Sequence, residues 1–322
     1  MKTIVERLTR FVQRVFKTTL DIFLEALKLS PNAQGYVSGS ITELLLKNKM
    51  EKEYGFEVKR IREKWEGKKK HHGDFYFRRL AANKWYVLES KGVKSNSEKW
   101  HKLYNHDNLR SFLIAHADSF PSNKRYRDVA MQVDVWIEAN LPKFKSDYLT
   151  PLYEYEEVKK YLRNKPKRDT EKSRAIDMLG GLSRDQISSL IAERLEYLMS
   201  KVKVLETHFV SGTSSSSERT QATPRKDEFH VVSVDIALRY PEHKFLFANP
   251  KQLESSGDDP NHLQQNYIMG FVFVGDDGTY ALSLTDEWYE NFMDVFESLD
   301  PDEAVDEKDM QIDNRYVITE ED

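Results

Sequence analysis

The hydrophobic pattern in the first third of the chain predicts a helix followed by three strands. Apolar residues recur at helical spacing in residues 38–50 (SGSITELLLKNKM), behind a serine suited to cap a helix. Gly55 then interrupts the helix, and residues 56–61 alternate apolar and charged positions as a half-buried strand does. Two aromatic and β-branched runs, residues 75–77 and 85–88, flank a short turn. Together they predict a hairpin.

Helical and strand patterns alternate along the rest of the chain. Helical spacing covers residues 107–117, 153–162, 186–204 and 286–299, and strand patterns cover residues 129–137, 229–238, 244–248, 267–274 and 279–284. The last two strands enclose the turn Gly275-Asp276-Asp277-Gly278, so they predict a second hairpin. The polar, turn-rich run GTSSSSERTQATPR, residues 212–225, predicts a loop.

These elements predict an α/β fold: a central mixed β-sheet flanked by helices, with a helical insertion and a C-terminal hairpin-helix element. Along the chain we expect five regions. They are the N-terminal helices with the first sheet strands (1–104), a mainly helical region (105–210), a flexible loop (211–226), the remaining strands with a hairpin and a helix (227–300), and an acidic tail (301–322).

Composition narrows the class of protein. The chain of 322 residues has no cysteine, which excludes disulfide scaffolds, thiol catalysis and cysteine-ligated zinc and fits a reducing compartment. No apolar stretch approaches membrane-spanning length, and residues 1–29 carry charges throughout, unlike the apolar core of a signal peptide. We therefore expect a soluble, cytoplasmic protein with no membrane partner.

Charge is unevenly distributed along the chain. The net charge of -4 hides a basic beginning and an acidic end: residues 1–110 carry 24 Lys and Arg against 13 Asp and Glu, whereas residues 251–322 carry 3 against 20. A basic region attracts a polyanion, and an acidic region is repelled by one. Residues 300–322 have the composition of a solvated acidic tail.

Charged residues at the ends of the first predicted hairpin form the strongest candidate site. Asp74 opens one apolar run, and fifteen residues later Glu89, followed by Lys91, ends the next. On adjacent strands, one carboxylate from each strand can point to the same edge and share a divalent cation, while Lys91 projects from the same face as Glu89. Such a group suits hydrolysis of phosphate esters. The alternative is an exposed hairpin with charged ends, although the apolar run 85–88 lacks the polar alternation of such a hairpin.

The spacing of Asp74, fourteen further residues and then Glu89-Ser90-Lys91 resembles the motif of the PD-(D/E)XK nuclease superfamily. Gly73 stands where the family name has proline, a departure that the family tolerates. The predicted order of helix, strand and hairpin also matches the order in that superfamily. With a basic loop before the motif and the run KGVKSN at its end, the chain looks most like a type II restriction endonuclease. The resemblance covers residues 38–101 well and the remainder in outline.

The resemblance implies Mg²⁺ as the cofactor and a role for each motif residue. Asp74 and Glu89 would hold the ion with the Ser90 carbonyl as a third ligand, because Mg²⁺ prefers carboxylate and carbonyl oxygens. Lys91 would either deprotonate the attacking water, with a lowered pKa, or orient it as a positioned charge. Many members carry a further acid on the first helix. Glu43 takes this position here, and its other interpretation is a plain surface glutamate.

Basic and polar residues around the motif are predicted DNA contacts. Cations and small donors suit phosphate oxygens, whereas Arg and Gln also suit base edges in the major groove. The predicted phosphate contacts are Lys68, Lys69, Lys70, His71, His72, Lys94, Ser95, Asn96 and Lys99, and the predicted base readers are Arg219, Gln221 and Arg225. The alternative for each group is an ordinary solvated loop.

The expected function is that of a Mg²⁺-dependent endodeoxyribonuclease that hydrolyses phosphodiester bonds in double-stranded DNA at a specific sequence, as the type II enzymes of restriction-modification systems do. A homodimer is expected if the target is a palindrome. Two alternatives stay open. One is a DNA repair or junction-resolving nuclease of the same superfamily, and the other is a non-catalytic DNA-binding protein in which the hairpin charges are structural.

Overall fold

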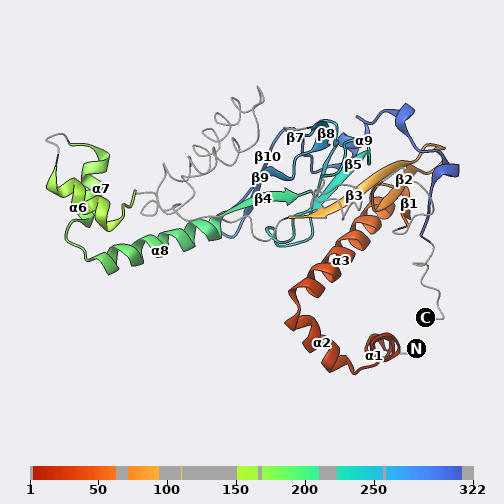
Figure 1. The fold of residues 1–322 in the computed structure, drawn as a ribbon, viewed down its shortest axis with the longest axis horizontal. Helices are drawn as coiled ribbons and strands as arrows, with labels where there is room; N and C mark the ends of the chain where they lie inside the picture. The colour runs from red at the N-terminus through yellow and green to blue at the C-terminus, as the bar shows by residue number, and fades with distance from the viewer. Residues whose placement is uncertain are drawn as a thin grey trace. The chain divides into compact units, whose positions relative to one another are not determined.

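The protein is mixed α/β, with a mixed central sheet and flanking helices, as the hydrophobic pattern predicts. A computed structural model describes residues 3–62, 72–93, 110, 151–165, 169–209, 223–256 and 259–313. Two compact units make up the chain: Met1–Gly92 with Asp300–Asp322, and Val93–Leu299. Figure 1 labels the elements of both. Within the described part of the chain, no helix combines the length and the apolar character needed to cross a membrane.

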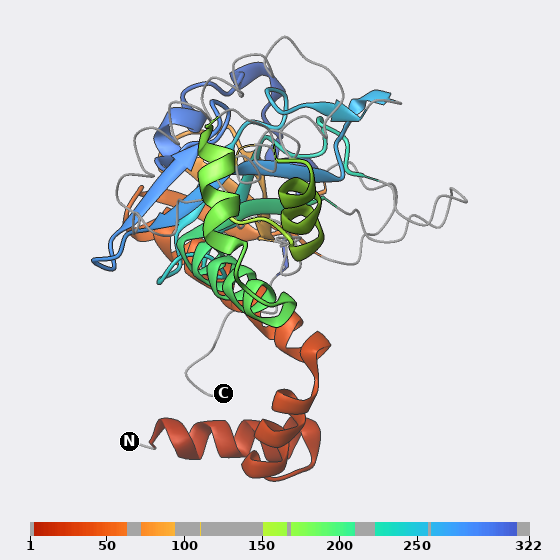
Figure 2. The same cartoon turned by 90° about the vertical axis from the view of Figure 1, so that its left-hand side faces the viewer.

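Three helices open the first unit: α1 (Ile4–Phe16), α2 (Leu20–Leu29) and α3 (Pro31–Lys52). The helix predicted from residue 38 begins seven residues earlier, because Ser30 caps it and Pro31 occupies its first turn. The Ser30 hydroxyl accepts a hydrogen bond from the Ala33 N–H at 3.3 Å, and proline at the first helical position loses no hydrogen bond. Figure 2 shows α1 and α2 at the end of α3 that lies away from the first sheet strands.

The strands of the first unit are β1 (Phe56–Arg60), β2 (Phe75–Arg79) and β3 (Tyr86–Gly92), which pair as an antiparallel meander. Gly55, with φ of +70°, supplies the left-handed turn between α3 and β1. Alternation along β1 places Phe56 and Val58 on a buried face, and Arg60 on that same face pairs with Glu43 of α3. Helix α3 therefore covers this face of the sheet.

The C-terminal acidic segment corrects one expectation. Residues 300–313 are not a solvated tail: Val305 bridges Trp85, and Ile312 bridges Ile61. The Asp313 N–H donates to the Arg60 carbonyl at 2.9 Å, so the segment continues the sheet beyond β1. Two 3-10 turns, Pro301–Glu303 and Glu307–Asp309, lie in this segment. It therefore covers an edge that would otherwise expose unpaired backbone groups.

The second unit holds four further helices and seven strands in its described residues. They are α6 (Tyr155–Arg163), α7 (Glu171–Leu179), α8 (Arg184–Lys201), β4 (Val202–His208), β5 (Val231–Asp235), β6 (Phe245–Ala248), β7 (Ser255–Ser256), β8 (Asp259–Leu263), β9 (Asn266–Val274), β10 (Tyr280–Leu284) and the short helix α9 (Phe292–Phe296). Strands β10, β9 and β4 form one antiparallel sheet, β5 pairs with β6, and β7 pairs with β8.

Most predicted elements of the second unit are confirmed, with two corrections. The helix predicted to run to residue 204 ends at Lys201, because Val202 and Val204 are fully buried in β4. The helix predicted at 286–299 is only α9, Phe292–Phe296. The second hairpin and the strand pair β5–β6 form where the alternation placed them. The predicted helix 107–117, strand 129–137 and most of the loop 212–225 lie outside the described residues.

Candidate functional site

Asp74 is fixed where β2 begins. Its N–H donates to the Leu88 carbonyl, and its own carbonyl accepts from the Ile61 N–H, both at 2.9 Å. Both neighbouring strands therefore hold its backbone. Its side chain also reaches β3, because Oδ2 accepts the Ser90 N–H at 2.7 Å. This hydrogen bond ties the first motif residue directly to the Glu-Ser-Lys segment.

Glu89 and Lys91 lie close to Asp74 at one end of the β2–β3 hairpin. The last pair of the ladder at this end is Phe75 with Leu88; Asp74 precedes Phe75, and Glu89 follows Leu88. The charges of Asp74 and Glu89 both act on the Lys91 ammonium group. Lys91 donates to Glu89 Oε1, and both side chains are half-buried. The structure thus brings the three motif residues together at one end of the hairpin, as the spacing predicts.

Glu43 joins this group from helix α3. Its side chain is half-buried, and Oε2 lies 2.5 Å from the Arg60 guanidinium. It also interacts electrostatically with Lys91. Arg60 is a site residue that the sequence pattern did not single out. A charge at the end of an otherwise apolar strand face, after Phe56 and Val58, is the signal that could have identified it.

The pKa of Lys91 lies above its ordinary value. Burial acts to lower the pKa, but the charges of Glu89 and Asp74, the hydrogen bond to Glu89 and the charge of Glu43 together outweigh it. Lys91 is therefore a cation among three carboxylates. Of the two roles expected for this residue, its surroundings favour the positioned charge over the neutral base.

The donor set suits a hard divalent cation in chemistry. Asp74 and Glu89 offer carboxylate oxygens from adjacent strands, and oxygen is the ligand atom that Mg²⁺ prefers. Ser90 contributes its N–H to Asp74, and its carbonyl as a ligand stays a prediction. Among the residues that the structure describes, no three His, Asp or Glu side chains already stand in a metal-binding arrangement.

Close packing explains why position 73, just before Asp74, holds a glycine. A Cβ atom at this position would lie 2.4 Å from Val87 Cγ1 and 3.0 Å from the Leu88 carbonyl oxygen. Val87 is fully buried, so its methyl group occupies the space that any larger residue at position 73 would need. A glycine at position 73 and a valine at position 87 are thus packed as a pair.

Elsewhere on the sheet of the first unit, a compact cluster of charged side chains surrounds Trp85. The Lys59 ammonium lies 4.5 Å and the Arg78 guanidinium 4.3 Å from the centre of the fully buried Trp85 ring. Glu57 pairs with both cations, at 3.2 Å and 2.7 Å. These cations stabilise the sheet through ring and carboxylate contacts. Their charge is thus already engaged within the fold.

The predicted DNA contacts mostly fall outside the described residues. This holds for Lys68, Lys69, Lys70, His71, Lys94, Ser95, Asn96, Lys99, Arg219 and Gln221. His72 is described and half-buried. Arg225 is also described, and its guanidinium binds both carboxylate oxygens of Asp227 at 2.9 Å. Arg225 could contact a DNA base only after its two hydrogen bonds to Asp227 break.

The second unit contains a carboxylate–histidine pair that the sequence pattern also did not reveal. Asp235, at the end of β5, is almost fully buried, and its Oδ2 lies 2.6 Å from Nδ1 of His243. Its Oδ1 accepts the Ala237 N–H at 3.0 Å. Asp235 therefore holds both the turn after β5 and the His243 ring in place.

Comparison of the chain with protein-family models, with curated proteins and with solved structures finds no match.

Proposed function

We propose that the protein is a Mg²⁺-dependent endodeoxyribonuclease that cuts double-stranded DNA at a specific sequence. The observation that carries the proposal is the hydrogen bond from the Ser90 N–H to Asp74, which joins the two halves of the motif at one end of the hairpin. With it, Lys91 lies within the field of Asp74, Glu89 and Glu43. Several carboxylates around one ammonium group are the ingredients of metal-assisted phosphoryl transfer.

Each residue has a task in this proposal. A bound Mg²⁺ would neutralise charge on the scissile phosphate and lower the pKa of a water molecule. Asp74 and Glu89 supply the oxygens that hold the ion, and the strand ladder fixes their separation. Lys91 places its ammonium group beside them, where it orients the attacking water by charge. Arg60 positions Glu43 through their ion pair and so fixes the side of the group that faces α3.

The charge distribution supports DNA as the substrate. The site lies in the basic first third of the chain, where 24 Lys and Arg stand against 13 Asp and Glu. The acidic segment 300–313 pairs with the same sheet and offsets part of this positive charge. Phosphate contacts supply most of the affinity of a protein for DNA, and they depend on such positive charge. Sequence-specific cutting, a cytoplasmic location and a homodimer on a palindromic site belong to the same proposal.

A digest of mixed plasmid and phage DNA by the purified full chain tests this function. We expect discrete fragments with Mg²⁺ and intact DNA with EDTA, and we expect Glu89→Gln to abolish cutting. The matched control is Glu290→Gln, because Glu290 also pairs with a lysine, Lys244, at 2.5 Å in the second unit. This variant should cut as the wild type does.

Other outcomes of the digest separate the alternatives. Nicking of branched or damaged DNA without discrete fragments, lost in Glu89→Gln, would replace the restriction enzyme by a repair or junction-resolving nuclease. Intact DNA under all conditions, combined with tight binding in EDTA, would overturn the enzyme and leave a DNA-binding protein whose hairpin charges are structural.

A further inference from the structure

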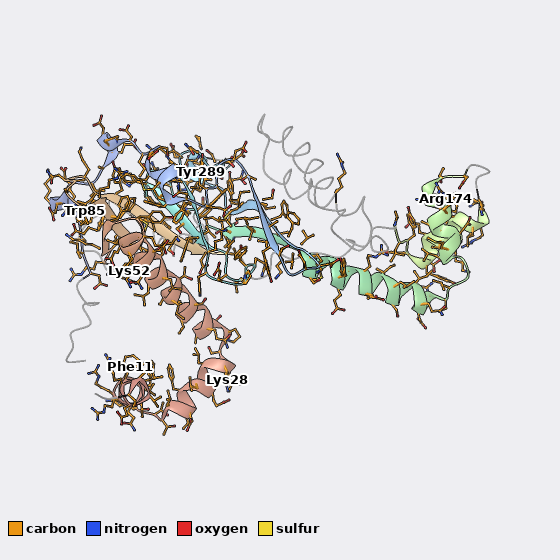
Figure 3. The ribbon with its side chains drawn as sticks, turned by 180° about the vertical axis from the view of Figure 1, so that it is seen from behind. Phe11, Lys28, Lys52, Trp85, Arg174 and Tyr289 are labelled. Atoms are coloured by element: carbon orange, nitrogen blue, oxygen red, sulfur yellow. The ribbon has the colours of Figure 1, made fainter. Side chains whose placement is uncertain are left out.

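The N-terminal helices expose far more apolar surface than the rest of the first unit. We call α1, α2 and residues 31–45 of α3 the N-terminal arm. Its large apolar side chains with 37–82 % exposure are Ile4, Val5, Leu8, Phe11, Val15, Phe16, Ile22, Leu24, Leu29, Tyr36, Val37, Ile41, Leu44 and Leu45. Figure 3 labels Phe11 and Lys28 on this arm, away from Trp85 in the sheet. Such an arm needs a partner surface.

The exposed area matches a stable protein interface. A large aromatic side chain buries about 150–250 Å², so this half-exposed set presents on the order of 1,000 Å². The largest apolar patch on a monomer is usually ~300–600 Å². A standard interface needs ~800 Å² from each partner. The arm therefore offers the surface of one side of a specific complex.

Helices α1 and α2 cover each other only in part. The Phe16 ring packs against Phe23 with centroids 4.9 Å apart and against Phe11 at 6.1 Å. These contacts bury Val12 completely, but it is the one buried residue of α1. Ile4, Val5, Leu8 and Val15 of α1 are exposed. Internal packing of the arm thus leaves its outer face open.

Helix α3 has apolar side chains on two opposite faces. Thr42, Leu46 and Met50 are buried on the face that covers the sheet. On the other face Val37, Ile41 and Leu44 follow one another at intervals of four and three residues, and Asn48 comes four residues later. All four are exposed. This is the spacing of a coiled-coil seam, in which a single asparagine fixes the register of the two helices.

We infer that a second copy of the chain covers this face, with the α3 seam (Val37, Ile41, Leu44 and Asn48) packed against its counterpart about a twofold axis. A seam of this spacing is complementary to itself, so one chain supplies both sides of the interface. An anionic membrane is the other occupant that the test must separate. Arg7, Arg10 and Arg14 of α1 would attract anionic lipids, whereas Asp21 and Glu25 of α2 would be repelled by them, so charge does not select a membrane. The inference deepens the homodimer of the proposed function by naming its interface. It uses no residue of the candidate site, so the mass and cross-linking tests can fail while the DNA digest succeeds, and the reverse.

Light scattering on the full chain at micromolar concentration is the first test. The wild type should have twice the mass of one chain, and the double variant Val37→Lys/Ile41→Lys should fall to one chain. Both side chains are already exposed, so the variant should fold. The matched control is Leu80→Lys, because Leu80 is a 67 % exposed leucine of the same unit outside the arm. It should keep the mass of the wild type.

Single cysteines locate the contact, since the natural chain contains none. Val37→Cys, Ile41→Cys and Asn48→Cys should each be tested for oxidative cross-linking, with Leu80→Cys as the control. A parallel seam cross-links at all three positions, and an antiparallel seam cross-links at the position nearest the twofold axis. A monomeric wild type, a dimer that persists in the double variant, or no cross-link at any seam position would overturn the inference. A monomer that instead binds phosphatidylserine vesicles through the arm would assign the surface to membranes.

Discussion

Two hairpins of the protein, β2–β3 and β9–β10, share their antiparallel pairing but differ in where their charges point. In the first, Asp74, Glu89 and Lys91 come from both strands and meet at one end of the hairpin. In the second, the acids lie in the turn between the strands, and local partners satisfy them. Asp277 accepts from the N–H and hydroxyl of Thr279 at 3.0 Å and 2.7 Å. An acid beside an apolar run is therefore not enough to mark a site.

Each hairpin also has a carboxylate that pairs with a half-buried lysine. Lys91 lies on β3 itself, and Lys201 is the last residue of α8. Lys201 contacts Asp276 at 3.0 Å and donates to the Gly275 carbonyl at 3.2 Å. Lys91 instead interacts with the carboxylates of Glu89, Asp74 and Glu43. The ammonium group of Lys91, with several carboxylates around it, can exchange one contact for another. The ammonium group of Lys201, with one carboxylate and one carbonyl, holds a turn in place. The difference predicts which hairpin carries chemistry.

The largest contrast should appear in DNA cleavage. Asp74→Asn removes a carboxylate charge from the first hairpin but keeps its shape, and we expect a loss of roughly 100- to 1,000-fold in the rate of plasmid cleavage with Mg²⁺. Asp277→Asn in the second hairpin should change the rate by less than about twofold, since no chemistry is assigned there. Equal losses in both variants would remove the distinction between the hairpins.

Stability should show the opposite order. Gly270 of β9 has φ of +149°, and a Cβ there would lie 2.0 Å from the Ser283 carbonyl oxygen. Because backbone cannot move aside, Gly270→Ala should lower the free energy of unfolding by more than the ~1–3 kcal/mol of ordinary over-packing. In the control Gly278→Ala, φ is also positive but no atom lies within 4 Å. It should cost only about 1 kcal/mol in urea unfolding.

A smaller effect tests the packed pair beside the motif. Gly73→Ala should lower the free energy of unfolding by about 1–3 kcal/mol, because its Cβ meets a methyl group of Val87. Val87→Ala alone leaves a cavity and should also destabilise. The double variant should be more stable than the sum of the single effects predicts. Strict additivity in urea unfolding would show that the two positions do not share space.

The smallest expected effect is a pH dependence of the first unit. Burial acts to raise the pKa of Glu57, but Arg78 and Lys59 outweigh it and hold the pKa below its ordinary value. A lowered folded-state pKa gives stability that is present above the unfolded-state value and is lost as pH falls through the folded-state value. Wild type should therefore lose more stability than Glu57→Gln between about pH 5 and about pH 3. Parallel loss in urea midpoints would contradict this assignment.

The sequence predicted the parts that depend on local alternation. Strand β1 follows its period of two, and β2 and β3 follow from their aromatic and β-branched runs, whose ends place Asp74 and Glu89 at the same end of the hairpin. It also predicted the β9–β10 hairpin from its Gly-Asp-Asp-Gly turn. In these places neighbouring residues alone decide the structure.

The rest depends on contacts that are distant in sequence. Helix α3 begins at Pro31, where the exposed arm gives no core-facing periodicity to mark the start. The edge segment at 300–313 has few apolar residues, and only its bridges to Ile61 and Trp85 distinguish it from a solvated tail. Arg60 depends on the rotation of α3 about its axis, which places Glu43 within 2.5 Å. Patterning of single segments does not encode such pairings.

The most direct test of the account compares Lys91→Ala with Lys201→Ala in cleavage of supercoiled plasmid at saturating DNA with Mg²⁺. Both variants remove a half-buried, acid-paired lysine: Lys91 on β3, and Lys201 at the end of α8, where it contacts the β9–β10 turn. We expect Lys91→Ala to bind DNA with wild-type affinity and to cut it about 100-fold more slowly or worse, and Lys201→Ala to cut at the wild-type rate. Cleavage by Lys91→Ala at the rate of Lys201→Ala would contradict the assignment of the site.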